Sequence, residues 1–357
     1  MEWLLTIAVL FVSLSNGAND NFKGFATVWG SAALSYRQAL LFATIATVAG
    51  SLASWILAGT LVEQFSGKGL IPDAITSTPL FILGVASGTA MTVFLATRLG
   101  FPVSTTHALI GGLIGASLGQ NGGEVHFAKL ANAFLLPLLF SPMLAAVLGM
   151  LAYRLFCLRP VEKDCVCLIA SSPIPVSDGA LVNQFSAPSI VLSLDATCER
   201  LDIQARISVS RSLDRLHVLS AMSICFARGV NDTPKLAALL IASHLFDNRV
   251  SFALIGITMA IGGLLFARKV AETMSQRITH MDHAQGFAAN LITATLVLFA
   301  SKFGLPVSTT HVSVGSIAGA GASAKMLNWH ALRNVFLSWT ATLPLAAVAA
   351  WCVVKII

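Results

Sequence analysis

Charged and amide side chains stand inside two long apolar stretches of this 357-residue sequence, at matching places in its two halves. Each copy reads Asn-Asp with a Lys three residues after the Asp, and together they comprise Asn19, Asp20, Lys23, Asn231, Asp232 and Lys235. A charge inside a hydrocarbon layer costs at least ~2.5 kcal/mol and normally marks an ion or substrate pathway. Structural Asp–Lys pairing at i, i+3 is the competing interpretation, but an apolar pair would pack better. We therefore interpret these residues as a binding site.

A second repeated motif places three hydroxyl residues after a proline. Pro-Val-Ser-Thr-Thr-His occupies 102–107 and again 306–311. Its hydroxyl residues are Ser104, Thr105, Thr106, Ser308, Thr309 and Thr310. Proline followed by hydroxyl residues favours the first turn of a helix, where free N–H groups and the dipole bind anions. Two such termini can enclose one tetrahedral anion near the membrane midplane; helix capping by the hydroxyls is the alternative interpretation.

Ion coupling has candidates in the same motifs. His107 and His311 follow the hydroxyl residues, and with Asp20 and Asp232 they are candidate proton carriers, although packing is the commoner role of a membrane histidine. Asp20 and Asp232 with the amides Asn19 and Asn231 are the candidate site for sodium. The six cysteines match no zinc or disulfide framework. We expect no cofactor, and either a proton or sodium as the coupling ion.

Composition places most of this chain in a lipid bilayer. It is 56% hydrophobic and 11% charged, with a mean hydropathy of +0.80, whereas a soluble domain has about 25% charged residues. This excludes a water-soluble fold. The net charge of +6 comes from basic residues dispersed over loops, without the basic run typical of nucleic-acid binding. We expect lipid around the protein and no nucleic-acid partner.

The apolar stretches predict five membrane spans in each half, and the first span of each half is expected to be interrupted at its charged motif. The ten predicted spans are 3–34, 39–62, 79–97, 101–119, 130–153, 215–243, 250–267, 285–301, 305–323 and 331–357. Re-entrant hairpins would raise the count to twelve. The predicted fold is an all-α polytopic membrane protein of two repeats, each of about five to six helices, with broken or re-entrant helices at the midplane.

The odd number of spans determines how the halves are oriented. A first membrane repeat at 1–158 and a second at 213–357 enter the membrane from opposite sides, which makes them inverted-topology repeats. With the N-terminus outside, most basic loop residues fall inside, as the positive-inside rule requires. The polar segment 159–212 then becomes a cytoplasmic linker or small soluble subdomain. We expect an integral multi-pass protein of a bacterial-type cytoplasmic (inner) membrane.

The paired motifs resemble those of the inorganic phosphate transporter (PiT) family. Gly-Ala-Asn-Asp at 17–20 and Gly-Val-Asn-Asp at 229–232, each followed downstream by Pro-Val-Ser-Thr-Thr-His, carry the resemblance across both halves. That family consists of cation-coupled phosphate symporters with some sulfate-transporting relatives. The resemblance implies that Asn19, Asp20, Asn231 and Asp232 line the ion and substrate site with the hydroxyl residues. A homodimer is compatible with such a fold.

One departure from the family motif affects the coupling ion. The family usually has a second Asn where this sequence has Lys23 and Lys235. A fixed ammonium group can replace a bound sodium ion electrostatically and can attract a dianion. We hypothesise that coupling here uses protons through Asp, Lys or His side chains.

The predicted function is secondary active transport of inorganic phosphate by alternating access. Phosphate near neutral pH retains a proton that a carboxylate can accept as a hydrogen bond, whereas sulfate does not. A sulfate or broader oxyanion permease and a passive anion channel are the alternatives. A membrane enzyme is not expected, because no nucleophile, base and orienting group are arranged in a recognisable motif.

Overall fold

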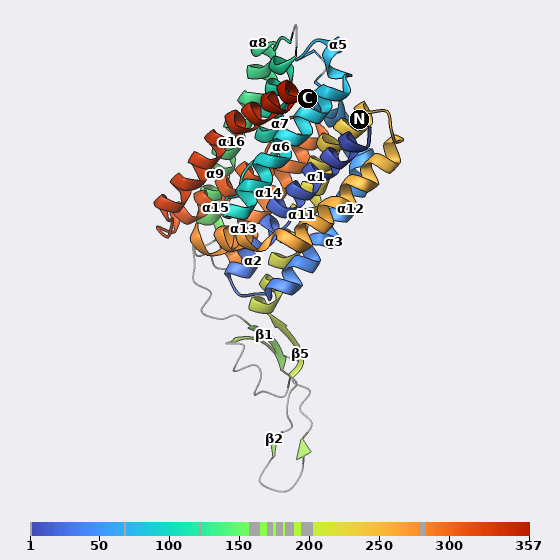
Figure 1. Ribbon diagram of the computed structural model, residues 1–357. Helices are drawn as coiled ribbons and strands as arrows, with labels where there is room; N and C mark the ends of the chain where they lie inside the picture. Colours follow the sequence, from blue (N-terminus) through green and yellow to red (C-terminus); the bar gives the residue numbers. More distant parts are fainter. Residues whose placement is uncertain are drawn as a thin grey trace.

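The chain forms a helical bundle in which both termini lie at the same end (Figure 1). The computed structural model describes residues 2–67, 69–120, 123–156, 165–169, 174–175, 181–182, 189–193, 203–278 and 283–357, with side chains described outside 156–211. In the first half the helices are α1 (Glu2–Asp20), η1 (Lys23–Phe25), α2 (Ala26–Gly30), α3 (Tyr36–Leu57), α4 (Gly59–Phe65), α5 (Asp73–Thr76), α6 (Pro79–Leu99), α7 (Thr105–Gly119), α8 (Phe127–Leu130), η2 (Ala131–Leu135) and α9 (Leu136–Phe156).

The second half repeats this order of long helices. Its elements are α11 (Val209–Ala242), α12 (Asn248–Phe266), α13 (Arg268–Glu272), η3 (Thr273–Arg277), α14 (His283–Lys302), α15 (Thr309–Ser323) and α16 (Trp329–Ile356). Between the halves lie the strands β1 (Cys165–Ile169), β2 (Ile174–Pro175), β3 (Leu181–Val182), β4 (Ser189–Ser193) and β5 (Ile203–Ser208). They form an antiparallel sheet of order β4-β1-β5 and a β2-β3 pair. Most other residues of the predicted segment 159–212 lie outside the described residues.

Local sequence signals explain where the long helices begin and end. The Ser35 side chain and Gln38 form a capping box at the start of α3. Thr78 caps α6, which has Pro79 in its first turn. Gly100 ends α6 with φ 81°, a left-handed conformation that glycine adopts without a steric penalty.

Six described helical segments are long and apolar enough to cross a membrane. They are Tyr36–Leu57, Pro79–Leu99, Phe127–Leu155, Asn248–Phe266, His283–Lys302 and Trp329–Ile356. Each overlaps one of the ten predicted spans. The other four predicted spans contain the motifs and correspond to α1, α7, α11 and α15. Both α7 and α15 have 15 residues, or about 22 Å of helix, which is shorter than the ~30 Å hydrocarbon core.

The predicted interruption is present in the first half and absent from the second. In the first half α1 ends at Asp20, and a 3-10 turn at Lys23–Phe25 precedes α2. The same prediction for the second half, at the charged motif of Asn231 and Asp232, is wrong, because α11 runs unbroken through the motif and through Gly229 and Pro234 on either side of it. Proline removes one backbone hydrogen bond, but packing of α11 against α3, α12 and α14 supports the helix on several sides.

The two halves pack through reciprocal helix pairs. The pairs α1–α12 and α3–α11 match one another when the halves are exchanged, as do α7–α16 and α9–α15. A Cβ added at Gly115 would overlap the carbonyl oxygen of Ala347, and one at Gly319 would overlap that of Ala146. Glycine therefore allows the closest approach of α7 to α16 and of α15 to α9, as small residues do in membrane helix pairs.

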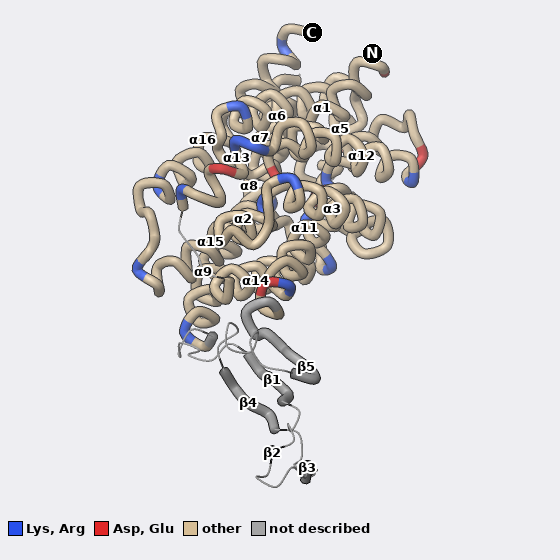
Figure 2. The backbone as a smooth tube through the Cα atoms, turned by 90° about the horizontal axis from the view of Figure 1, so that it is seen from below, with Lys and Arg blue, Asp and Glu red and all other residues tan. Residues whose placement is uncertain are grey.

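The burial pattern is that of a protein surrounded by lipid. Large apolar side chains such as Leu52, Leu99 and Phe140 are exposed on the outside, while many hydroxyl, amide and charged side chains are buried. Figure 2 shows the charged residues of the described part as a few short coloured stretches on a tube that is mostly tan, the colour of all other residues. The chain is therefore an integral, multi-pass membrane protein.

Candidate functional site

Both Pro-Val-Ser-Thr-Thr-His motifs start a helix after an extended turn. After α6 ends, Ser104 caps α7, and its hydroxyl accepts the backbone N–H of His107 at 3.2 Å. In the second half Ser308 caps α15 in the same way, at 3.3 Å from the N–H of His311. The predicted helix starts are thus confirmed, and these two serine hydroxyls act as caps.

In the first half, Asn19 and Lys23 hold the extended segment before α7. The Asn19 amide donates to the carbonyl of Phe101 at 3.0 Å and accepts the N–H of Val103 at 3.1 Å. Lys23 donates to the carbonyl of Val103 at 3.0 Å and to the hydroxyl of Thr310 in the other half. One ammonium group therefore joins the break after α1 to the extended segment before α7 and to the first turn of α15.

In the second half, Asn231 and Lys235 repeat this arrangement. Asn231 accepts the hydroxyl of Ser301 at 3.1 Å, and its amide group lies 3.4 Å from the carbonyl of Val307. Lys235 donates to that carbonyl at 2.8 Å and to the hydroxyl of Thr106 at 2.9 Å. Each lysine thus bonds a backbone carbonyl of its own half and a threonine of the other half.

The two aspartates meet at the centre of this arrangement. Asp20 forms a buried ion pair with Lys23, and Asp232 lies 3.5 Å from Lys235. The Asn16 amide lies 3.4 Å from a carboxylate oxygen of each aspartate. The sites predicted separately in the two halves therefore form one cluster.

The sequence reasoning missed two components of the cluster, Asn16 and the Arg228 side chain. The larger omission is Arg228. It is 1% exposed, and its guanidinium donates to Asn16 at 2.8 Å and to Asn21 at 3.2 Å. Its Nε lies 3.5 Å from Asp232, at i, i+4. The motif comparison overlooked it because the matching position in the first half is Asn16, but a charge within an apolar stretch was a signal that could have identified it.

Of the other two predicted threonines, Thr105 contacts the cluster and Thr309 is buried at the equivalent position. Thr105 accepts the Asn16 amide at 2.9 Å, and Thr309 is buried in the corresponding turn of α15. All twelve predicted binding residues are buried, with exposures of no more than 5%.

The two predicted coupling histidines lie next to each other. The ring centroids of His107 and His311 are 4.6 Å apart, and His311 lies 3.9 Å from the Trp339 ring. Within the described residues, no hydrogen bond joins either imidazole to Asp20 or Asp232. The two histidines therefore pack against each other and, through His311, against Trp339, rather than hydrogen-bonding to the aspartates.

The charges and donors of the cluster suit an anion. Three basic side chains, Lys23, Arg228 and Lys235, face two carboxylates, so the group is cationic when all five are ionised. Hydroxyl groups and two helix N-termini adjoin them, and such termini attract negative charge. For sodium, the amide oxygens of Asn19 and Asn231 already accept hydrogen bonds. The geometry therefore fits an oxyanion better than a sodium ion.

Comparisons with known proteins agree over nearly the whole chain. A sequence model of the phosphate transporter family matches residues 16–350. A relative from Thermococcus kodakarensis with the provisional name of phosphate permease is 30% identical, over 99% of this chain and 98% of its own. The chloroplastic inorganic phosphate transporter 2-1 of Arabidopsis thaliana is 27% identical, over 99% of this chain and 73% of its own.

A solved structure is also similar. The protein described as the sodium-dependent phosphate transporter superimposes with a TM-score of 0.78 at 23% identity, over 99% of this chain and 98% of that chain. This similarity shows a shared fold.

Proposed function

Because this chain belongs to the phosphate transporter family, a family of permeases rather than enzymes, we propose that it carries inorganic phosphate across a cytoplasmic membrane by alternating access. The observation that carries the proposal is the pair of reciprocal lysine contacts, Lys23 with Thr310 and Lys235 with Thr106. These contacts place ammonium groups, hydroxyls and helix N-termini of both halves around one position. A tetrahedral dianion needs donors on several sides, and this position supplies them.

Alternating access follows from the proposed division into repeats at 1–158 and 213–357. The reciprocal helix pairs support an inverted duplication, in which one half rocks against the other around a fixed central site. In the described conformation each lysine links the two halves. We propose that an entering phosphate takes over the lysine and threonine contacts, which lets the halves separate on one side of the membrane and then on the other.

The coupling ion that we propose is the proton. Lys23 pairs with Asp20 and Lys235 lies beside Asp232, so ammonium groups stand where the motif of the resembling family usually has a neutral Asn. A sodium ion at this position would be repelled by the three basic side chains. Sodium is the alternative coupling ion, because the solved structure with the same fold is described as a sodium-dependent phosphate transporter. The uptake experiment therefore includes a sodium gradient.

The substrate that we propose is phosphate rather than sulfate. At neutral pH phosphate retains a proton that it can donate to Asp20 or Asp232, while sulfate meets the same carboxylates with acceptors only and is repelled. The names of the Thermococcus kodakarensis permease and of the Arabidopsis thaliana transporter point to the same substrate.

Radiolabelled phosphate uptake into proteoliposomes tests this function. A proton gradient is expected to drive accumulation above equilibrium, a sodium gradient alone is not, and excess unlabelled sulfate is expected to leave uptake unchanged. The paired variant Lys23→Asn/Lys235→Asn restores the family amides, and its uptake is expected to become dependent on sodium.

Uptake that only equilibrates phosphate across the membrane would indicate a passive channel, and equal block by sulfate would indicate a broader oxyanion carrier. Either result would overturn the proposal.

A further inference from the structure

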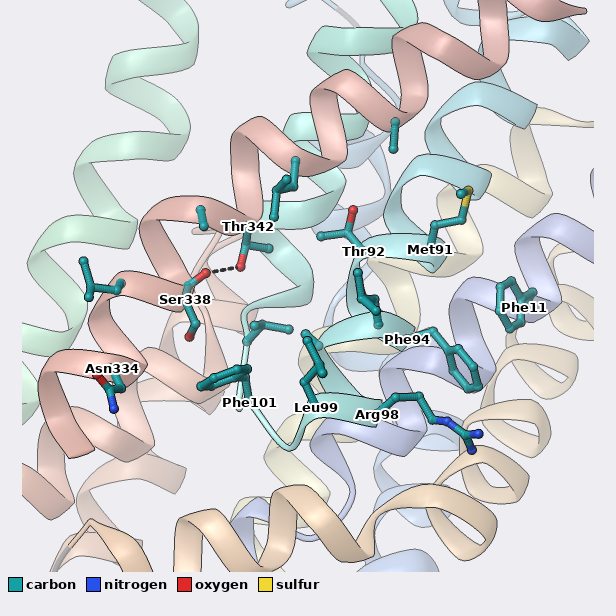
Figure 3. Close-up of a pocket in the computed structure, with 17 residues that line it drawn as sticks. Phe11, Met91, Thr92, Phe94, Arg98, Leu99, Phe101, Asn334, Ser338 and Thr342 are labelled. Carbon is teal, nitrogen blue, oxygen red and sulfur yellow. Dashed lines mark hydrogen bonds between the residues drawn. The ribbon is translucent and has the colours of Figure 1, made fainter. Parts of the chain in front are cut away.

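A cavity of about 990 Å³ opens on the lipid-facing side of the bundle, between α6 and α16 (Figure 3). Phe11 of α1 and the segment after α6 complete its wall. Leu99 and Leu345, which line it, are 63% and 57% exposed, so the cavity is open toward the membrane. None of the twelve proposed binding residues lines it. It is therefore separate from the transport site.

The wall of this cavity is suited to hydrocarbon. The hydroxyl of Thr92 donates to the carbonyl of Gly88 at 2.9 Å, and that of Thr342 donates to the carbonyl of Ser338 at 2.6 Å. These bonds within α6 and α16 satisfy the hydroxyl donors, so both threonines can offer methyl groups to an occupant. From Asn334 to Ala349 the lining extends about 22 Å along α16. That is longer than the roughly 15 Å that one leaflet contributes to the hydrocarbon core.

One end of the cavity is cationic. Arg98 lines this end, with its guanidinium 5.7 Å from the Phe94 ring centroid, and Figure 3 shows it beside Leu99 at the edge of the group. Lys269 of α13 donates to the Arg98 carbonyl at 3.0 Å, which brings a second positive charge close. Among the described residues, no carboxylate forms an ion pair with Arg98.

We propose that this cavity binds an anionic phospholipid, with an acyl chain along α6 and α16 and the headgroup phosphate at Arg98. An elongated apolar groove lined at one end by Arg98, with Lys269 bonded to the Arg98 carbonyl behind it, is complementary to an acyl chain that ends in an anionic headgroup. A zwitterionic headgroup also has a phosphate, but it places a cation of its own beside Arg98 and is therefore less complementary to this end of the cavity.

The lipid would also contact the segment that supports the transport site. Phe101 and Val103 line the cavity, while the carbonyls of the same two residues accept hydrogen bonds from Asn19 and Lys23. Filling the cavity therefore supports this extended segment from behind. The expected consequence, which rests on the proposed function, is faster phosphate uptake in membranes that contain the anionic lipid.

Native mass spectrometry of the full chain tests the binding directly. The protein is equilibrated with phosphatidylglycerol and phosphatidylcholine of identical acyl chains. We expect preferential retention of one phosphatidylglycerol. Arg98→Gln is expected to reduce this preference about five-fold, the factor that one basic residue near a membrane surface contributes. Arg154→Gln, which removes an exposed arginine of α9 outside the cavity, is the matched control. Ala341→Trp fills the cavity and is expected to displace both lipids.

Three results would overturn the proposal: equal retention of the two lipids, equal loss of preference in Arg98→Gln and Arg154→Gln, or efficient disulfide cross-linking of two chains through Leu337→Cys in a cysteine-free background. The last result would show that a second copy covers the cavity.

Uptake measured in liposomes with and without phosphatidylglycerol separates the lipid proposal from the transport proposal. If the native chain transports phosphate but does not prefer phosphatidylglycerol, the lipid site alone is contradicted. If it prefers phosphatidylglycerol but does not transport phosphate, the transport function alone is contradicted.

Discussion

At the scale of single residues, fixed positive charges inside the membrane are the main feature of the proposed site. Lys23 and Lys235 were identifiable from sequence because a charge within an apolar span needs a reason. Their contacts with Thr310 and Thr106 were not, because these join residues far apart in the chain. Arg228 escaped a search based on repetition, since Asn16 takes its place in the other half. An asymmetric component of a duplicated site is the kind of residue that such a search misses.

Replacing Arg228 tests whether its buried charge is needed both for stability and for phosphate uptake. Arg228→Gln leaves Asp232 with fewer partners, and breaking a buried ion pair costs about 3–5 kcal/mol. We expect a lower melting temperature in detergent and loss of phosphate uptake, with partial recovery of both in Arg228→Lys. Arg268→Gln removes an exposed i, i+4 pair with Glu272 and is expected to cost less than about 1 kcal/mol. Similar melting temperatures for Arg228→Gln and Arg268→Gln would contradict this role.

Removing one hydroxyl tests the contacts between the halves. Thr310→Val keeps the side-chain shape but removes the acceptor of Lys23, and a hydrogen bond to a charged group contributes about 1.5–3 kcal/mol. We expect uptake to fall about ten-fold or more. Thr106→Val should have the same effect through Lys235. Thr340→Val, at an exposed hydroxyl bonded within α16, should transport normally. Normal uptake by both buried variants would exclude these threonines from the site.

At the scale of elements, the sequence predicted where helices lie better than how they continue. The six apolar spans followed from hydropathy, and Ser104 and Ser308 marked helix starts correctly. The break expected in α11 did not occur, because a glycine or proline permits unwinding without requiring it. Tertiary contacts decide the outcome: the Gly229 position of α11 lies against the backbone of α3, where an added side chain would not fit.

Two matched glycines test the close packing between the halves. Gly115→Ala and Gly319→Ala each place a methyl group against the backbone of a neighbouring helix, and overpacking costs about 1–3 kcal/mol. We expect a lower melting temperature for both. Gly59→Ala, where an added Cβ meets no atom within 4 Å, is the control and should be neutral. Unchanged melting temperatures of the first two variants would mean that α7 and α16, and α15 and α9, can move apart with no loss of stability.

At the scale of the whole molecule, the proposed inverted repeats account for the reciprocal helix pairs and for two copies of each motif meeting in one site. An odd number of crossings in each half puts the two chain ends on one side of the membrane and the segment between the halves on the other. This topology was predicted from the sequence, by the number of spans in each half and by the positions of the basic loop residues. Which helices of one half contact the other half could not be predicted from it.

Side-specific labelling tests this topology. In a cysteine-free background, Glu2→Cys and Ile357→Cys should react from the outside with a membrane-impermeant maleimide in intact cells. Arg277→Cys, after α12, should react only once the membrane is opened. Labelling of the two ends from different sides would rule out five crossings in each half.

In the proposed mechanism, fixed ammonium and guanidinium groups replace sodium in holding the anion. Equilibrium binding of radiolabelled phosphate to the purified full chain, with and without sodium, tests it most directly. The account predicts the same affinity in sodium and in choline for the native chain, and sodium-dependent binding for Lys23→Asn/Lys235→Asn. Phosphate binding by the native chain only when sodium is present would contradict it.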